Sequence, residues 1–348
     1  RALAGDEVVL IGLTSGEERV EGQALGAGTL AVVRISSPPV DRLNFKRRAA
    51  WTLRTDARLV AHALRYLRWA DELLFTASPP FLEHLIVPLS PFFPARVVFR
   101  IADLHPECLI NELERTPAWL KGFLELARFH RRRVDGVEVL GDDQKRLLVA
   151  QGVAPHRIVL RRSVAPVTIT SETRPVEVPR LLRDKVILLY SGAVGHAHEF
   201  ETFVEGFRRH HQAGSGRVGF WLNAAGARAD EFEEALQRHA LPVHRSKPVP
   251  IDQLASLLVT PAAHLITLRE EYTGLVVPSK VYGCLASGRD ILFVGSEGCD
   301  VPLLCSPKGP GAYQRVAPDD ASGMAAALEI LADRSEMNAA SAPATKSE

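Results

Sequence analysis

Short runs of apolar, mostly β-branched residues recur along the chain and alternate with longer amphipathic stretches. The first series of such runs lies at Val8–Ile11, Leu30–Val33, Leu73–Phe75, Val97–Phe99 and Val137–Leu140. The second series begins after residue 180, at Val186–Tyr190, Val218–Trp221, His264–Thr267 and Ile291–Val294. Because strands buried on both faces are continuously apolar and are joined by helices, this pattern predicts an α/β protein with parallel sheets.

Amphipathic segments in the second half of the chain predict the helices that would cover its sheet. They lie at Glu199–His210, Asp230–His239, Ile251–Leu258 and Ser279–Ala286. Pro250 or Asp252 is suited to the start of the third segment, and Pro278 with Ser279 is suited to the first turn of the fourth.

The segment Val164–Pro179 separates the two series of strands. It is rich in Pro, Thr, Ser and Glu and has neither helical nor strand periodicity, which is typical of a linker. A length of 348 residues also favours two domains. We therefore expect an N-terminal domain over residues 1–165, a C-terminal domain over 166–334 and a disordered tail over 335–348.

Composition and charge exclude several classes of protein. Hydrophobic residues make up 46% and charged residues 24%, which is typical of a soluble globular chain, and the net charge of +1 gives no global attraction to nucleic acid. The 4 cysteines are too far apart for a zinc or redox motif. No apolar stretch is long enough to span a membrane, and the N-terminus lacks the pattern of a signal peptide. We expect a cytoplasmic protein without a metal site.

Two loops that follow strands of the second series carry candidate ligand-binding residues. The first, within Tyr190–Phe200, contains Gly192 and Gly195, which let the backbone approach a ligand at the point where a helix begins and attracts anions. It lacks the third glycine of the dinucleotide fingerprint, so an ordinary strand-to-helix turn remains an alternative. His196 and His198 are further candidates for phosphate contacts, although each is more typical of a polar residue at a helix start.

The second loop contains Glu270 and Glu271 and leads to a helix whose first turn carries Ser279 and Lys280. A lysine there places a mobile positive charge beside free backbone donors, which suits a diphosphate. Taken alone, these residues are better explained as a solvated lysine on an ordinary helix and a surface pair of glutamates. Because both loops follow strands of one parallel sheet, we expect a single ligand between them.

The segment Asp41–Ala70 is basic, with eight Lys or Arg residues and two acidic ones, and aromatic residues are interleaved with the charges. Such a helix is suited to anionic headgroups or to a lipid diphosphate. The alternative is a helix that packs its aromatic side chains inward and leaves solvated arginines outside. Arg131–Arg133 are candidates to extend the basic surface.

Most of the chain, from about Ala4 to Leu331, resembles the retaining GT-B glycosyltransferases of family 4, and in particular the bacterial branch that builds lipopolysaccharide, capsule and colanic-acid glycans. The segments that carry the resemblance are Ser78–Pro80, Asp103–Glu107, Tyr190–Phe200, Val277–Tyr282 and Gly288–Arg289. It implies two Rossmann-like domains with an interdomain cleft. It further implies a nucleotide-sugar donor, with UDP as the expected nucleotide, held by the C-terminal domain, and a glycan, lipid-linked or small-molecule acceptor held by the N-terminal domain.

The resemblance also implies roles for particular residues. Glu271 would lie close to the transferred sugar. The donor contacts would come from Gly192, Gly195, His196, Thr273, Gly274, Leu275, Ser279 and Lys280. Asp103 and His105, at the end of a strand, would orient or deprotonate the acceptor hydroxyl, unless Asp103 only caps a turn and His105 only precedes a proline. No cofactor or metal is implied, and the protein would be cytoplasmic, with contact to the inner face of the plasma membrane through residues 41–70.

The sequence also departs from the family pattern. A second glutamate usually follows the first by eight positions, where this chain has Ser279, and an alternative alignment places Gly283 at the ribose-binding carboxylate. The strand, glycine-rich loop and helix that open family members are not matched, so the first β-α unit is expected to be missing. A sugar-nucleotide epimerase, a nicotinamide-dependent oxidoreductase and a non-catalytic nucleotide-sugar-binding subunit therefore remain alternatives.

Overall fold

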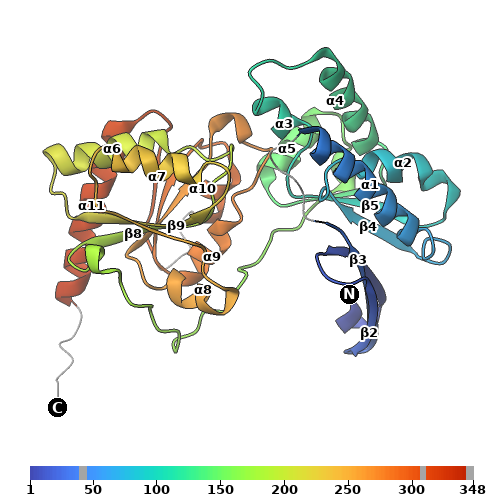
Figure 1. Ribbon diagram of the computed structural model, residues 1–348, viewed down its shortest axis with the longest axis horizontal. Coiled ribbons are helices and arrows are strands. Elements are labelled where there is room, and N and C mark those ends of the chain that lie inside the picture. The colour runs from blue at the N-terminus through green and yellow to red at the C-terminus, as the bar shows by residue number, and fades with distance from the viewer. Residues whose placement is uncertain (39–44, 306–310, 342–348) are drawn as a thin grey trace. The chain divides into compact units, whose positions relative to one another are not determined.

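A computed structural model describes residues 1–38, 45–305 and 311–341, and the chain forms two compact units. The N-terminal unit consists of Arg1–Val139 and Leu148–Val159, and the C-terminal unit consists of Leu140–Leu147 and Leu160–Glu348. The chain therefore passes between the units at three places, whereas the linker composition led us to expect one boundary. Figure 1 shows strands and helices in both units.

The N-terminal unit contains two sheets. Strands β1 (Glu7–Thr14), β3 (Gly28–Ser36) and β2 (Arg19–Leu25) form one sheet in that order, and β4 (Glu72–Thr76), β5 (Arg96–Ile101), β6 (Gly136–Val139) and β7 (Ile158–Leu160) form the other. β1 pairs with β3, β4 with β5 and β5 with β6 in parallel, as the apolar runs predicted. β2 pairs with β3 in antiparallel fashion and was not predicted, because its side chains are almost all exposed and show no apolar alternation.

The helices of the N-terminal unit are short apart from two. They are α1 (Phe45–Ala63), α2 (Glu83–Leu89), α3 (Glu107–Asn111) and α4 (Ala118–Arg131). Helix α1 falls within the expected basic segment, whose first residues, 41–44, lie outside the described part of the chain. Helix α5 (Asp142–Ala150) begins in the C-terminal unit and ends in the N-terminal unit.

The C-terminal unit is built on one parallel sheet in the order β10-β9-β8-β11-β12-β13. Its strands are β8 (Val186–Ala193), β9 (Val218–Ala225), β10 (Val243–Ser246), β11 (Ala263–Thr267), β12 (Asp290–Val294) and β13 (Tyr313–Val316). Numbered from β8, this is the order 3-2-1-4-5-6 of a Rossmann sheet. The four strands predicted in this half are confirmed as β8, β9, β11 and β12.

Helices cover both faces of this sheet. They are α6 (Glu201–Ala213), α7 (Ala229–Gln237), α8 (Ile251–Leu258), α9 (Lys280–Ser287), α10 (Asp300–Cys305) and α11 (Ala321–Ser341). The four predicted amphipathic helices are confirmed to within a few residues as α6, α7, α8 and α9. Helix α11 continues through Ser341, so its last turns occupy residues expected in the tail, and residues 342–348 lie outside the described part of the chain.

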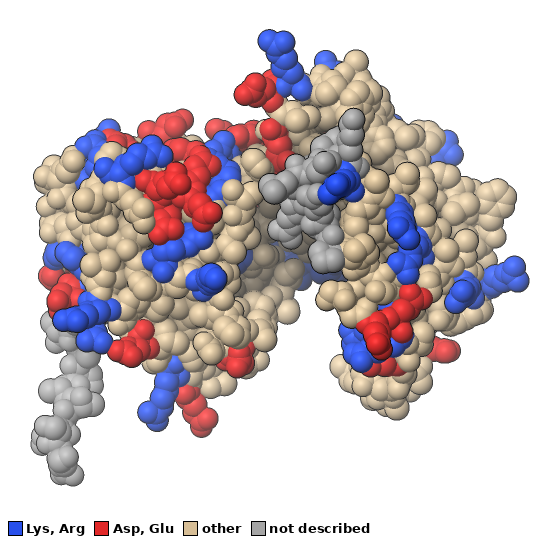
Figure 2. Space-filling view, in the orientation of Figure 1, with Lys and Arg blue, Asp and Glu red and all other residues tan. Residues whose placement is uncertain are grey.

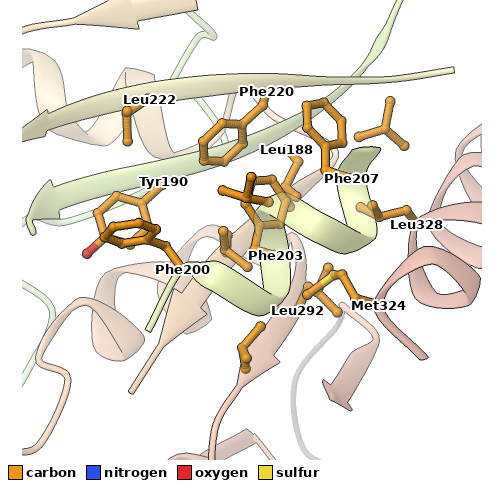
Figure 3. Packing of buried hydrophobic residues seen from close by; sticks show 14 of the residues in the cluster. Leu188, Tyr190, Phe200, Phe203, Phe207, Phe220, Leu222, Leu292, Met324 and Leu328 are labelled. Carbon is orange, nitrogen blue, oxygen red and sulfur yellow. The ribbon is translucent and has the colours of Figure 1, made fainter. Parts of the chain in front are cut away.

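Aromatic and aliphatic side chains fill the layer between the sheet and helices α6, α7 and α11. Figure 3 shows Phe203 and Phe207 of α6 pointing toward Phe220 of β9. The ring centroids of Phe203 and Phe220 are 4.5 Å apart, and both side chains are fully buried. Each such ring stabilises the unit by about 2–3 kcal/mol through burial. This core also contains side chains of β8 and β11, whose carboxyl ends carry the site described next.

Candidate functional site

The site lies at the switch point of the C-terminal sheet. β8 and β11 are neighbours in the sheet, and the order of the strands reverses between them. Loops that leave such neighbouring strands turn to opposite faces and open a crevice at the carboxyl ends of the strands, where open α/β sheets bind ligands. These loops are residues 194–200 after β8 and 268–279 after β11, so the two sequence-derived candidate loops belong to adjacent strands.

Hydrogen bonds join the two loops directly. The amide of Arg269 donates to the carbonyl of Ala197 over 2.8 Å, and its guanidinium donates to the carbonyl of His198 over 3.3 Å. The same guanidinium forms an ion pair of 2.7 Å with Glu201 at the start of α6. Arg228, before α7, also donates to the His198 carbonyl and pairs with Glu201. The loops are therefore held as one surface, although the sequence did not single out these arginines.

Lys280, the first residue of α9, points back to β8. Its Nζ lies 3.5 Å from the centroid of the Tyr190 ring, and this atom is buried and has no hydrogen-bond partner among the described residues. A Cβ atom placed on Gly192 would come within 3.8 Å of the Lys280 Cε, so the lysine and the glycine turn lie next to each other. Burial lowers the pKa of Lys280 to about 7. The structure thus places an uncompensated ammonium group beside the glycine turn.

Gly192 and Gly195 of the first loop differ in backbone conformation and in surroundings. Gly192 has a φ of 130°, a conformation that side chains other than glycine rarely adopt. A Cβ atom on Gly195 would meet no heavy atom within 4 Å, so the space beside it is open to a ligand. His196 is exposed.

His198 has a structural role in this loop. Its Nδ1 lies 3.0 Å from the carbonyl of Thr267 at the end of β11, and its ring meets Tyr190 edge to face at 5.9 Å. Burial, with the nearby Lys280 as the second cause, lowers the pKa of His198 to about 3. The imidazole is therefore neutral near pH 7 and supplies no positive charge for a phosphate.

The loop after β11 is internally bonded. The amides of Thr273 and Leu275 donate to the carbonyls of Glu270 and Tyr272 over 3.0 and 2.9 Å. Gly274 has a φ of 76°, and its amide donates to a carboxylate oxygen of Asp143 over 3.3 Å. The backbone donors expected to face the donor sugar thus have partners within the protein. The hydroxyl of Thr273 is buried and has no such partner.

Asp143 is a residue of this site that the sequence did not single out. Its carboxylate also accepts hydrogen bonds from the amides of Gln144 over 2.8 Å and Asp300 over 3.1 Å. Burial raises its pKa, and the nearby Asp300 carboxylate adds to the shift. Because Asp143 is more than 130 positions from its partners Gly274 and Asp300, local sequence patterns hold no signal for these contacts.

The two remaining candidates of this loop are exposed. Glu271 keeps 53% of its side chain accessible, and its carboxylate lies 3.9 Å from the Arg269 guanidinium. Ser279 is exposed at the start of α9 and forms no side-chain capping bond. On the visible face of the C-terminal unit, basic and acidic side chains are interspersed (Figure 2).

Asp103 and His105 follow β5 in the N-terminal unit. Asp103 is exposed, whereas His105 is partly buried. That burial lowers the pKa of His105, and the negative charge of Asp103 acts against this shift. The His105 ring lies 6.3 Å from that of Phe81, and its carbonyl accepts a hydrogen bond from the buried Arg131. Arg131 in turn forms two hydrogen bonds with Glu107, of 2.6 and 2.9 Å. His105 is thus fixed through its backbone beyond the carboxyl end of a parallel strand.

In the part of the chain that the structure describes, no group of three or more His, Cys, Asp or Glu side chains is arranged to hold a metal ion. No helix formed by these residues is long and apolar enough to cross a membrane.

Comparisons with known proteins identify the fold. Neither a scan of protein-family models nor a search of curated proteins found a match. Among solved structures, sucrose-phosphate synthase from Thermosynechococcus elongatus is similar with a TM-score of 0.65 and 15% identity, over 88% of this chain and 75% of that one. The UDP-forming α,α-trehalose-phosphate synthase from Burkholderia vietnamiensis has a TM-score of 0.59 and 16% identity, with 95% and 88% covered. Anabaena HepE, in complex with UDP and glucose, has a TM-score of 0.61 and 11% identity, with 88% and 77% covered.

These neighbours are GT-B glycosyltransferases with two Rossmann-like domains. The expected fold class, α/β with two Rossmann-like domains in the GT-B arrangement, is therefore confirmed. At identities of 11–16% the likeness establishes the fold and leaves the activity to be argued from the site.

Proposed function

We propose that the protein is a retaining glycosyltransferase. It would move a sugar from a nucleotide-diphosphate donor, with UDP as the expected nucleotide, to an acceptor hydroxyl in the biosynthesis of a bacterial surface glycan or another glycoconjugate. The comparisons support the donor class, because one neighbour is described as UDP-forming and another was solved with UDP and glucose. The surface-glycan role rests on the sequence resemblance described above.

The observation that carries the proposal is the position of Lys280. Its buried ammonium group has no hydrogen-bond partner, and it lies beside Gly192 at the switch point of a Rossmann sheet. A buried charge without a partner destabilises a protein unless a ligand supplies the opposite charge. A diphosphate at the carboxyl ends of β8 and β11 would supply it, and a nucleotide sugar is the ligand class that fits both this charge and this fold.

The reaction that we propose is the one that the family resemblance implies. The bond between the anomeric carbon and the diphosphate oxygen breaks, and the acceptor oxygen forms a new bond to the same face of the sugar. The acceptor proton passes to the leaving diphosphate, so the products are the glycoside and the free nucleotide. Lys280 would stabilise the negative charge that develops on the leaving group, and Glu271 would lie near the sugar. Asp103 and His105 would orient the acceptor hydroxyl from the N-terminal unit.

The donor is identified by measuring the thermal unfolding of the protein in the presence of UDP-, GDP-, dTDP- and ADP-sugars. A donor at 100 times its Kd stabilises the folded chain by about 2.7 kcal/mol, and we expect UDP-sugars to give the largest shift. Release of UDP in the presence of an acceptor panel then tests transfer. Glu271→Ala and Lys280→Met should each lower kcat/KM by roughly 100-fold. Glu270→Ala, which removes the neighbouring exposed glutamate, is the matched control.

Unchanged kcat/KM in both Glu271→Ala and Lys280→Met would refute the site. Product formation from the donor alone, without any acceptor, would favour the sugar-nucleotide epimerase instead. Stabilisation by a GDP- or dTDP-sugar in place of a UDP-sugar would keep the reaction class and overturn the nucleotide.

A non-catalytic nucleotide-sugar-binding subunit is the second candidate, and one observation favours it. At Gly283, one of the two positions where the family pattern has its ribose-binding carboxylate, an added Cβ atom would lie 3.1 Å from Leu258 of α8. This position faces α8 and carries no carboxylate. The other aligned position, Ser279, is exposed and has no carboxylate either. Binding of UDP-sugar without turnover on any acceptor would establish this second function.

If the acceptor is lipid-linked, we propose that α1 contacts the membrane surface. On this helix and the turn after it, Leu53, Arg54, Arg65, Arg68 and Trp69 are exposed, whereas Asp56 and Leu59 are buried. Exposed arginines beside exposed Leu and Trp side chains suit an anionic bilayer surface. Co-sedimentation with vesicles that contain anionic lipid, compared with purely zwitterionic vesicles, tests this contact.

A further inference from the structure

Tyr190 combines complete burial with an unusual neighbour. It lies in β8 with no exposed surface, and its hydroxyl donates to the carbonyl of Ala193 over 2.8 Å at the end of the same strand. One face of its ring carries the Lys280 ammonium group at 3.5 Å. Most buried tyrosines pack against apolar atoms, whereas this ring contacts a positive charge.

The groups around Lys280 offer no other compensation for its charge. The titratable groups that act on it or respond to it are Tyr190, His198 and Cys284. His198 is neutral near pH 7, and burial raises the pKa of the Cys284 thiol to about 12, so neither carries a negative charge. Among the described residues, no carboxylate pairs with the Lys280 Nζ. The ring of Tyr190 is thus the group that stabilises the ammonium form.

We propose that Tyr190 is a positioning residue for donor binding, whose ring takes the place of a counter-ion and holds the Lys280 ammonium group beside Gly192, where the donor diphosphate completes the charge balance. This inference rests on the proposed function. The diphosphate would approach the side of the ammonium group that faces away from the ring, so that the bound state keeps both contacts. A ring–cation contact of this kind, away from solvent, contributes about 1–2 kcal/mol.

Binding should then be linked to proton uptake. In the unliganded protein the pKa of Lys280 is lowered to about 7, and a bound diphosphate raises it because an adjacent negative charge favours the ammonium form. Above pH 7 the lysine of the free protein is increasingly neutral and must gain a proton when the donor binds. Donor affinity should therefore fall as the pH rises through about 7, by up to about tenfold per pH unit.

The test measures UDP-glucose affinity calorimetrically between about pH 6 and pH 8.5, in buffers of different ionisation enthalpy. UDP-glucose suits this range because its diphosphate is esterified at both ends and does not titrate there. Tyr190→Met removes the ring. This variant should bind UDP-glucose more weakly than wild type, and the difference should grow with pH and reach about tenfold. It should also take up more protons on binding than wild type does. Tyr190→Phe keeps the ring and should keep the wild-type pH midpoint, although it loses the bond to Ala193.

Two controls separate this role from a structural one. Phe207→Met removes an equally buried ring in the core of the same unit, and it should lower stability without moving the pH midpoint of binding. The second control titrates the Lys280 Cε resonance of labelled protein without any nucleotide. Its midpoint should lie near 7 in wild type and in Tyr190→Phe, and clearly lower in Tyr190→Met or, if that variant does not fold, in Tyr190→Leu.

The outcomes distinguish the two proposals. If wild type binds no nucleotide sugar, the proposed function fails, and the Lys280 titration still decides whether Tyr190 stabilises the ammonium group. If wild type binds UDP-glucose and Tyr190→Met shows the wild-type pH profile and the wild-type Lys280 midpoint, the positioning role is refuted while the proposed function stands.

Discussion

The Lys280 ammonium group shows what the sequence could and could not predict about a single residue. Lys280 begins a helix that follows a strand and its loop, and a glycine turn follows another strand of the same sheet. From this arrangement the sequence predicted that Lys280 belongs to a ligand site. Its neighbour Tyr190 was not predicted as a partner. An apolar run indicates that Tyr190 is buried, but the residue that covers it comes from a helix 90 positions later, and periodicity holds no information about such pairs.

Lys280→Met should stabilise the unliganded protein. The lowered pKa of Lys280 means that folding disfavours its charged form, so an apolar side chain of similar length should raise the free energy of unfolding by about 0.5–2 kcal/mol. The same substitution should abolish stabilisation by UDP-glucose. Urea denaturation with and without UDP-glucose measures both effects. Lys121→Met, at an exposed position of α4, should change neither by more than about 0.5 kcal/mol.

At the scale of elements, apolar runs and amphipathic segments predicted the central strands and covering helices of the C-terminal unit. Both signals depend on burial, because the buried face of a strand or helix gives a recognisable pattern of apolar positions along the sequence. β2 lacks this signal because its side chains are exposed, and it was missed. The bonds that fix the loop after β11 were also missed. They come from Asp143 and Arg269, whose partners are set by the folded chain and not by spacing.

Two helical glycines give a matched pair for the packing of elements. A Cβ atom on Gly206 of α6 would lie 2.3 Å from Met324 of α11, whereas a Cβ atom on Gly122 of α4 would meet nothing within 4 Å. Gly206→Ala should therefore destabilise by about 1–3 kcal/mol because α11 must shift. Gly122→Ala should stabilise by about 0.4–1 kcal/mol through helix propensity. Thermal unfolding of both variants checks this, and equal effects would contradict the packing of α6 against α11.

At the scale of the whole molecule, sequence composition predicted two domains, and the chain forms two compact units. It did not predict that Leu140–Leu147 would group with the C-terminal unit. This segment is held there by long-range polar contacts. Arg162 bridges Asp142 and Asp300, and Arg146 donates to the carbonyl of Gly298 over 2.6 Å. A linker is recognised from composition, whereas such contacts depend on residues far apart in the sequence.

The two units should respond differently to pH. In the N-terminal unit, burial raises the pKa of Asp56 and of Glu83 to about 7, and each carboxyl group has a buried oxygen without a hydrogen-bond partner. Folded chains thus hold protons that unfolded chains release above about pH 4–5. The contribution of these two carboxyl groups to the stability of this unit should therefore fall by about 1–3 kcal/mol as the pH rises from about 4 to 7, and then level off.

Asp56→Asn and Glu83→Gln should each flatten this pH dependence, and Glu125→Gln, at an exposed position, should leave it unchanged. Three of the 4 tryptophans lie in the N-terminal unit, so a Trp221→Phe background makes tryptophan fluorescence report on that unit alone. Urea titrations at several pH values give the slope. If Asp56→Asn and Glu83→Gln both keep the wild-type change of stability with pH in this background, the raised pKa values are contradicted.

The three passages of the chain between the units limit how this protein can be recombined with its relatives. A chimera joined once, within the linker, would bring Leu140–Leu147 from one parent and the loops around Gly274 and Asp300 from the other. The Asp143 carboxylate would then have to accept hydrogen bonds from amides of a foreign backbone. Exchange of the C-terminal unit in an intact form therefore requires two discontinuous blocks, residues 140–147 and 160–348, to be inherited together.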